Sequence, residues 1–139
     1  MDAKQLAQEH FEAFNDRSFF QNAEDRFDAN AVIIDGPSGQ QYHGPEGYVR
    51  YAQQFVTAMP DIKGTLIEQH ESGNKVTTRV HGQGTLTGTL HTPQGTVQGR
   101  GQKVDLEYQL VQECNDAGKI VRFTLNYDLP SFMKQVGMG

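Results

Sequence analysis

The stretch Val104-Asp105-Leu106-Glu107-Tyr108-Gln109-Leu110 decides the fold, because its apolar residues alternate strictly with its polar ones. Successive side chains of a β-strand point to opposite faces, so this stretch predicts a strand with one apolar and one polar face. The following stretch repeats the pattern, with Val121, Phe123, Leu125 and Tyr127 as its apolar residues. Two such strands predict an antiparallel sheet that helices cover on one side only.

The residues before these strands carry helical patterns. Apolar side chains recur at helical spacing from Ala3 to Phe14, which predicts a helix over residues 2–15. A second helix is expected over 19–28, and a third begins at Gly44-Pro45-Glu46, because proline is favoured in the first helical turn. Strands are expected over residues 31–34, 40–43, 62–71, 75–91, 96–112 and 119–128, with a loop around residues 93–95. Helices first and long strands afterwards predict an α+β fold.

Length and composition limit the classes of protein. The 139 residues fit one domain that buries its own core. The net charge of −5, without a cluster of lysine and arginine, argues against a nucleic-acid partner. No apolar run is long enough to span a membrane, so we expect no membrane partner. Because Cys114 is the single cysteine, no disulfide forms within the chain, and we expect a cytoplasmic protein.

The order of helix, helix, short strand pair, helix and long meander resembles the NTF2-like superfamily over nearly the whole chain. Two segments are similar to its SnoaL-like branch: residues 73–80 followed by Gly101-Gln102-Lys103-Val104, and residues 116–121, which run on to Phe132-Met133-Lys134-Gln135-Val136-Gly137. The resemblance implies a single SnoaL-like domain over residues 1–139. It also implies a cone in which N-terminal helices pack on a curved antiparallel sheet that encloses a pocket.

The resemblance implies an activity class as well. SnoaL-like proteins include polyketide cyclases, which close a ring by intramolecular aldol chemistry without a cofactor, and we therefore expect no cofactor. In these cyclases a His and an Asp from the last two strands act as acid and base. The matching positions here are Leu110 or Val111, and Leu125, all of them apolar. The usual cyclase mechanism would then require a shift of one residue, or a bulge that brings Asn126 or Asp128 inward.

Asp35 and His10 are the predicted catalytic residues. The stretch Ile33-Ile34-Asp35-Gly36-Pro37 resembles the one that carries the general base of ketosteroid isomerase. A carboxylate at the end of an apolar strand is partly desolvated, which makes it a better base near neutrality. The alternative is that Asp35 only orders its Gly-Pro turn. His10 lies where the isomerase has its oxyanion-hole tyrosine, and its alternative is a core histidine bonded to a backbone carbonyl.

Further residues are expected to line the pocket or to face away from it. The predicted ligand contacts are aromatic or aliphatic: Phe14, Tyr48, Tyr51, Phe55, Tyr108, Leu110, Phe123, Leu125 and Tyr127. For the tyrosines of the last two strands, the alternative is a purely structural place in the core. Arg79 and His81 share one face of a middle strand, and this face is expected to point outward. The alternative is an inward face, on which Arg79 would anchor an anion. The five histidines show no metal-ligand spacing, so no metal site is predicted.

Three hypotheses follow for function. The first is a cofactor-independent enzyme that abstracts a proton next to a carbonyl of a small apolar molecule, as an isomerase, cyclase or lyase would. The second is a binding protein for such a molecule without turnover. The third is a dimeric scaffold with a vestigial pocket. A homodimer through the polar sheet face is expected, since Gln109, Arg122 and the other polar residues of the two strands suit a hydrogen-bonded interface.

Overall fold

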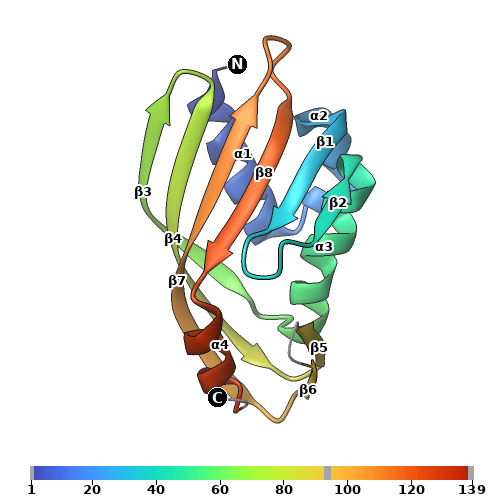
Figure 1. Ribbon diagram of the computed structural model, residues 1–139, viewed down its shortest axis with the longest axis vertical. Coiled ribbons are helices and arrows are strands. Elements are labelled where there is room, and N and C mark those ends of the chain that lie inside the picture. Colours follow the sequence, from blue (N-terminus) through green and yellow to red (C-terminus); the bar gives the residue numbers. More distant parts are fainter. Residues whose placement is uncertain (1, 93–94, 138–139) are drawn as a thin grey trace.

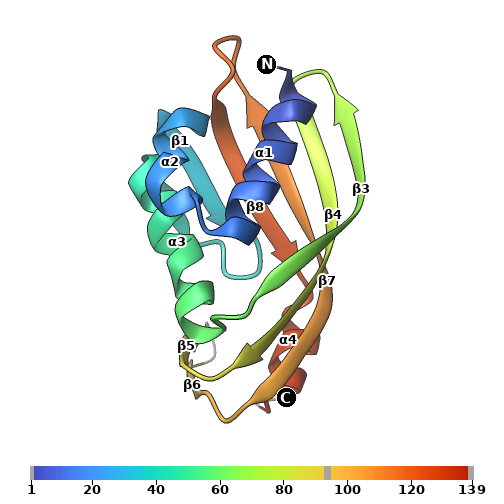
Figure 2. The same cartoon turned by 180° about the vertical axis from the view of Figure 1, so that it is seen from behind.

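Helices cover one face of a curved sheet in the computed structural model of the chain, which describes residues 2–92 and 95–137 (Figure 1; Figure 2). The helices are α1 (Ala3–Asp16), α2 (Phe19–Arg26), α3 (Gly44–Ala58) and α4 (Leu129–Gln135). The strands are β1 (Phe27–Asp35), β2 (Gln41–His43), β3 (Lys63–Ser72), β4 (Lys75–Leu86), β5 (Thr89–Thr92), β6 (Gly95–Gln98), β7 (Gln102–Cys114) and β8 (Ile120–Tyr127). The architecture is α+β, as predicted, and α1, α2 and α3 lie together behind the sheet in Figure 1.

The large sheet has six strands in the order β2-β1-β8-β7-β4-β3. Neighbouring strands are antiparallel except β1 and β8, which run parallel with Asp35 opposite Leu125. The sheet is therefore mixed, whereas an antiparallel sheet was expected. The short β1–β2 pair lies beside β8, which is the last strand of the meander. A long stretch of chain separates β1 from β8, so these two strands can run in the same direction.

The alternation that predicts the two central strands is present in the structure. Val104 and Leu110 of β7 are buried, while Asp105, Glu107 and Gln109 are exposed on the other face. In β8 the prediction needs one correction: Ile120 is fully buried and Val121 is only half-buried. The β7–β8 register shifts between Glu113 and Cys114, so the apolar face of β8 begins at Ile120.

Two predicted boundaries were wrong. β1 begins at Phe27, so the second helix is shorter and the strand longer than expected. The ring of Phe27 stacks on Tyr48, with centroids 4.6 Å apart, and the backbone of Phe27 is extended. The apolar pattern of the sequence alone had predicted that the second helix continues through this residue. The expected strand 75–91 is interrupted because the backbone N–H groups of Thr87 and Gly88 both donate to the carbonyl of Ala58, at 3.0 Å each.

The same interruption separates a small hairpin from the large sheet. β5 and β6 pair with each other at the end of α3, so the expected strand 96–112 is also two strands. Of the loop expected around residues 93–95, residues 93 and 94 lie outside the described ranges.

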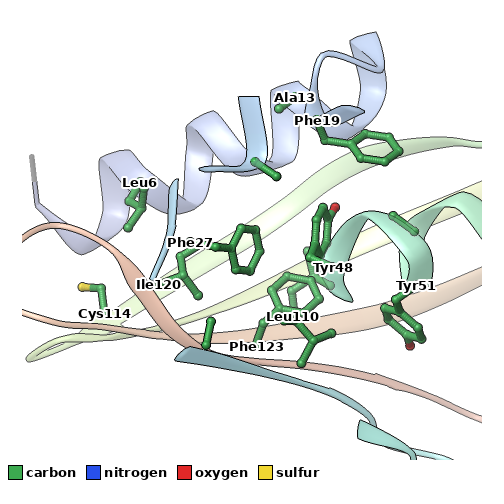
Figure 3. Packing of buried hydrophobic residues seen from close by; sticks show 14 of the residues in the cluster. Leu6, Ala13, Phe19, Phe27, Tyr48, Tyr51, Leu110, Cys114, Ile120 and Phe123 are labelled. Atoms are coloured by element: carbon green, nitrogen blue, oxygen red, sulfur yellow. The ribbon is translucent and has the colours of Figure 1, made fainter. Parts of the chain in front are cut away.

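The main core is an aromatic layer between the helices and the inner face of the sheet (Figure 3). Phe19, Phe27, Tyr48 and Phe123 are each at most 3% exposed, and their rings meet one another edge-on or stacked. Aromatic contacts of this kind add to the stabilisation that burial of the rings already provides. The aromatic layer separates α1 and α3 from the sheet, and two of its rings, those of Tyr48 and Phe123, also line a cavity.

Candidate functional site

A cavity of about 100 Å³ lies between α1, α3 and the inner face of the sheet. Its wall is almost wholly aromatic and aliphatic. The wall contains all of the predicted ligand contacts, namely Phe14, Tyr48, Tyr51, Phe55, Tyr108, Leu110, Phe123, Leu125 and Tyr127. It also contains His10. Their role in binding stays a prediction, but the fold does bring these side chains together.

Two glycines of β4 make room for this wall. Gly82 and Gly84 lie on the inner face, where a side chain would otherwise point into the cavity. A Cβ on Gly82 would lie 2.6 Å from Cε1 of Tyr108, so the tyrosine ring rests directly on the backbone. A Cβ on Gly84 would lie 3.2 Å from Sδ of Met59. These glycines were expected within the strand over residues 75–91, and their part in the cavity was not predicted.

Asp35 lies at the inner end of β1, beside the cavity rather than in its wall. Its carboxylate is 7% exposed and accepts three hydrogen bonds. The Tyr51 hydroxyl donates to Oδ1 at 2.6 Å, and the Ser38 hydroxyl donates to Oδ2 at 2.6 Å. The Ser38 N–H donates to Oδ2 at 3.2 Å, so the turn-ordering role expected as the alternative is also present.

Tyr51 connects Asp35 to the cavity, because its ring belongs to the wall and its hydroxyl is bonded to the carboxylate. Burial raises the pKa of Tyr51 far above its ordinary value, and the negative charge of Asp35 raises it further. The pKa of Tyr127 is raised for the same two reasons. The hydroxyl groups of Tyr51 and Tyr127 are therefore neutral at physiological pH.

His10 belongs both to the wall and to the aromatic core. It is 1% exposed, and its ring meets Phe27, Tyr48 and Phe123 edge-on, with centroids 4.8 to 5.5 Å apart. Burial lowers the pKa of His10 to about 3, with a smaller effect from the charge of Arg26. Its Nδ1 has no hydrogen-bond partner among the described residues, so the expected bond to a backbone carbonyl is absent at this atom. His10 is therefore a neutral imidazole with an unpaired nitrogen.

The positions that match the cyclase acid and base remain apolar. Leu110 and Leu125 both face the cavity, opposite each other in the β7–β8 register. No shift or bulge brings a substitute inward: Asn126 is exposed, and Asp128 caps α4 by accepting from the N–H of Ser131 at 3.3 Å. The arrangement known from the cyclases is thus absent at these positions.

The outer face of the sheet carries a separate set of charges. Arg79 pairs with Glu68 at 2.6 Å and with Glu107 at 3.2 Å, and His81 contacts Asp105. The outward orientation predicted for Arg79 and His81 is confirmed. Across residues 2–92 and 95–137 no cluster of three or more potential ligands could hold a metal ion. In the same ranges, no helix has the length and apolar character to cross a bilayer.

Comparison with known proteins gives the family. A model of the SnoaL-like polyketide cyclase family matches residues 5–136, and the chain therefore belongs to this family. No curated protein sequence matches the chain.

Solved structures agree on the fold. A proposed SnoaL-like polyketide cyclase from Jannaschia sp. CCS1 superposes with a TM-score of 0.81 at 16% identity, covering 98% of this chain and 94% of that one. IdmH, a proposed polyketide cyclase from Streptomyces antibioticus, superposes with a TM-score of 0.77 at 22% identity over 99% of both chains. A protein with a ketosteroid isomerase-like fold from Catenulispora acidiphila gives a TM-score of 0.74 at 15% identity, covering 96% and 93%. The NTF2-like, ketosteroid isomerase-like fold expected from the sequence is confirmed.

Proposed function

We propose that the chain is a cofactor-independent enzyme that binds a small, mostly apolar carbonyl compound in the cavity and moves a proton next to the carbonyl. The observation that supports this most is the 2.6 Å hydrogen bond from Tyr51 to Asp35, because it joins a buried carboxylate to a cavity wall that is otherwise apolar. A carboxylate in such surroundings is the usual proton acceptor for this chemistry. Family membership suggests a reaction of the isomerase or cyclase type.

The Asp35–Tyr51 pair takes the proton in this proposal. As the C–H bond of the substrate breaks, its proton goes to the hydroxyl oxygen of Tyr51, and the proton of Tyr51 passes to Oδ1 of Asp35. The electron pair left on carbon moves to the carbonyl oxygen and forms an enolate. Neutral His10 then donates its ring N–H to that oxygen, as an uncharged oxyanion partner. Return of the proton to another carbon, or attack of the enolate on a second carbonyl, completes isomerisation or cyclisation.

The activity is tested with small β,γ-unsaturated ketones, whose conversion to the conjugated isomer raises their ultraviolet absorbance. Asp35→Asn should lower the rate at least about a hundredfold, which is the usual contribution of a general base. Tyr51→Phe should lower it as well, because Asp35 then has no contact with the wall. Asp128→Asn is the matched control, since that carboxylate caps α4 and should leave the rate unchanged. Full activity of the Asp35→Asn protein would refute the assignment.

A second candidate is a binding protein that holds the same kind of molecule without turnover. Two observations favour it: Leu110 and Leu125 occupy the positions of the cyclase acid and base, and the cavity wall is almost wholly apolar. Thermal-shift measurements with the same ketones separate the two candidates. Ligands that raise the melting temperature but are never converted would favour the binding protein.

A further inference from the structure

Three deeply buried polar side chains beside the cavity have no adequate partners. Arg26 and Gln112 are each 4% exposed and His10 is 1% exposed. Among the described residues, no hydrogen bond reaches Nε or Nη2 of Arg26, Nδ1 of His10, or either side-chain polar atom of Gln112. A buried donor or acceptor left unpaired costs about 1–3 kcal/mol, so five such atoms indicate a polar group that occupies this region.

The three residues lie in the same region of the fold, near Phe27 and Phe123. Gln112 stands directly opposite Phe123 in the β7–β8 register, and the ring of Phe123 is 5.0 Å from that of His10. Arg26 directly precedes Phe27, whose ring is 5.5 Å from His10. The charge of Arg26 also lowers the pKa of His10, which agrees with their proximity. Because His10 belongs to the cavity wall, the cavity ends next to this polar group of side chains.

The free atoms of Arg26 define the chemistry of what would bind. Nη1 is already held by Asn22, at 2.5 Å from its side-chain oxygen and 3.3 Å from its carbonyl. Nε and Nη2 form the opposite edge of the guanidinium, and this edge presents two parallel N–H groups that match the two oxygens of a carboxylate. A buried cation of this kind requires a negative partner.

The described part of the chain does not supply that partner. Burial lowers the pKa of Arg26, and Tyr48 and the carboxylates of Glu9, Asp25 and Asp16 raise it. None of them forms an ion pair with Arg26 within 4.0 Å among the described residues. Among the described residues, the bidentate edge of Arg26 therefore has neither a hydrogen-bond partner nor an anionic one.

We propose that Arg26, with Gln112, binds the carboxylate of a ligand whose apolar part lies in the cavity, next to His10. The substrate class is then a small carboxylic acid, in which the carboxylate fixes the molecule and the apolar carbons fill the aromatic wall. This inference rests on the proposed function for the place of the apolar part, and Arg26 acts in it as a binding residue rather than as a catalytic one. A cavity of about 100 Å³ suits a short chain or a single ring.

The proposal is tested by binding, so that its outcome does not depend on turnover. Pentanoate and pentanamide have nearly the same shape and differ in charge, and their affinities are measured by NMR titration of the protein. We expect pentanoate to bind more tightly than pentanamide. Arg26→Met should weaken pentanoate about tenfold to a hundredfold and leave pentanamide within about twofold, because only a charged hydrogen-bond pair is lost. Arg50→Met, at an exposed arginine of α3, is the matched control and should change neither affinity.

The melting temperature provides a second readout. If Arg26 had only a structural role, its replacement would lower the melting temperature. Since the free edge of Arg26 and both polar atoms of Gln112 are unpaired, Arg26→Met and Gln112→Leu should keep or raise the melting temperature of the ligand-free protein. Arg26→Lys keeps the charge without the bidentate edge and should retain only part of the preference for pentanoate. Equal affinities for the two probes in the wild-type protein would overturn the proposal. So would an undiminished preference in Arg26→Met or, if that variant does not fold, an undiminished preference in both Arg26→Lys and Gln112→Leu.

If pentanoate binds more tightly than pentanamide, and the ketones bind but none is converted, the carboxylate site stands and the catalytic proposal fails. If the ketones are converted but pentanoate binds no more tightly than pentanamide, the catalytic proposal stands and the carboxylate site fails.

Discussion

Acidification should destabilise the protein through His10 well before its carboxylates are protonated. The pKa of His10 is about 3 in the folded protein, against 6.5 for an unperturbed histidine. Between these values the unfolded chain binds a proton that the folded protein excludes, so stability falls as pH drops below about 6.5. At pH 5 the loss from this single side chain is about 2 kcal/mol, because the pH lies about 1.5 units below the unfolded pKa and each unit is worth about 1.4 kcal/mol.

Urea unfolding at pH 7.5 and pH 5 measures this loss, and His10→Leu isolates it. Leucine has a similar volume, carries no proton and removes the unpaired Nδ1, so the variant should lose about 2 kcal/mol less than the wild-type protein over this range. His91→Gln, at an exposed histidine of β5, is the control and should follow the wild-type profile. Parallel profiles for wild-type and His10→Leu proteins would refute the reasoning, since they would mean that His10 titrates equally in the folded and unfolded states.

The remaining predictions concern packing, capping and assembly. Gly82→Ala should cost about 1–3 kcal/mol in urea unfolding, because its Cβ would lie 2.6 Å from a ring carbon of Tyr108. Asp2→Ala should cost about 1 kcal/mol in the same assay, because Asp2 closes the capping box of α1; an unchanged midpoint would contradict the capping role. A homodimer through the outer sheet face remains a proposal: light scattering should find a dimer that Arg122→Glu with Gln109→Glu separates, and a wild-type monomer would exclude it.

The fold was predictable because its signal is local. Strict alternation in the central strands determines which face of the sheet is apolar, and Val104 and Leu110 lie inward as this pattern requires. The boundaries were less predictable, because they depend on partners distant in sequence. Phe27 enters a strand where it stacks on Tyr48, and the shift that turns Ile120 inward arises between two strands. Neither effect leaves a local signal.

In the candidate site, the apolar wall was predictable from the sequence and the polar contacts were not. Apolar wall residues follow from the faces of the helices and strands, and the cavity brings the predicted ones together. Polar contacts do not follow from those faces: the bond between Tyr51 and Asp35 depends on where α3 lies against β1. The unpaired edge of Arg26 was missed altogether, because the sequence gives no sign that an arginine at the end of a short helix is 4% exposed. An unpaired guanidinium edge points to a ligand only when the arginine is buried, because an exposed edge is hydrogen-bonded by water.

The most direct test of the proposed chemistry is deuterium incorporation next to the carbonyl of a bound ketone in D₂O, followed by NMR. Proton abstraction by the Asp35–Tyr51 pair predicts exchange at that carbon in the wild-type protein, faster than in buffer alone. It also predicts loss of the acceleration in Asp35→Asn at ketone concentrations that saturate both proteins. Exchange at the buffer rate in the wild-type protein, with the ketone demonstrably bound, would contradict the account and leave a binding protein.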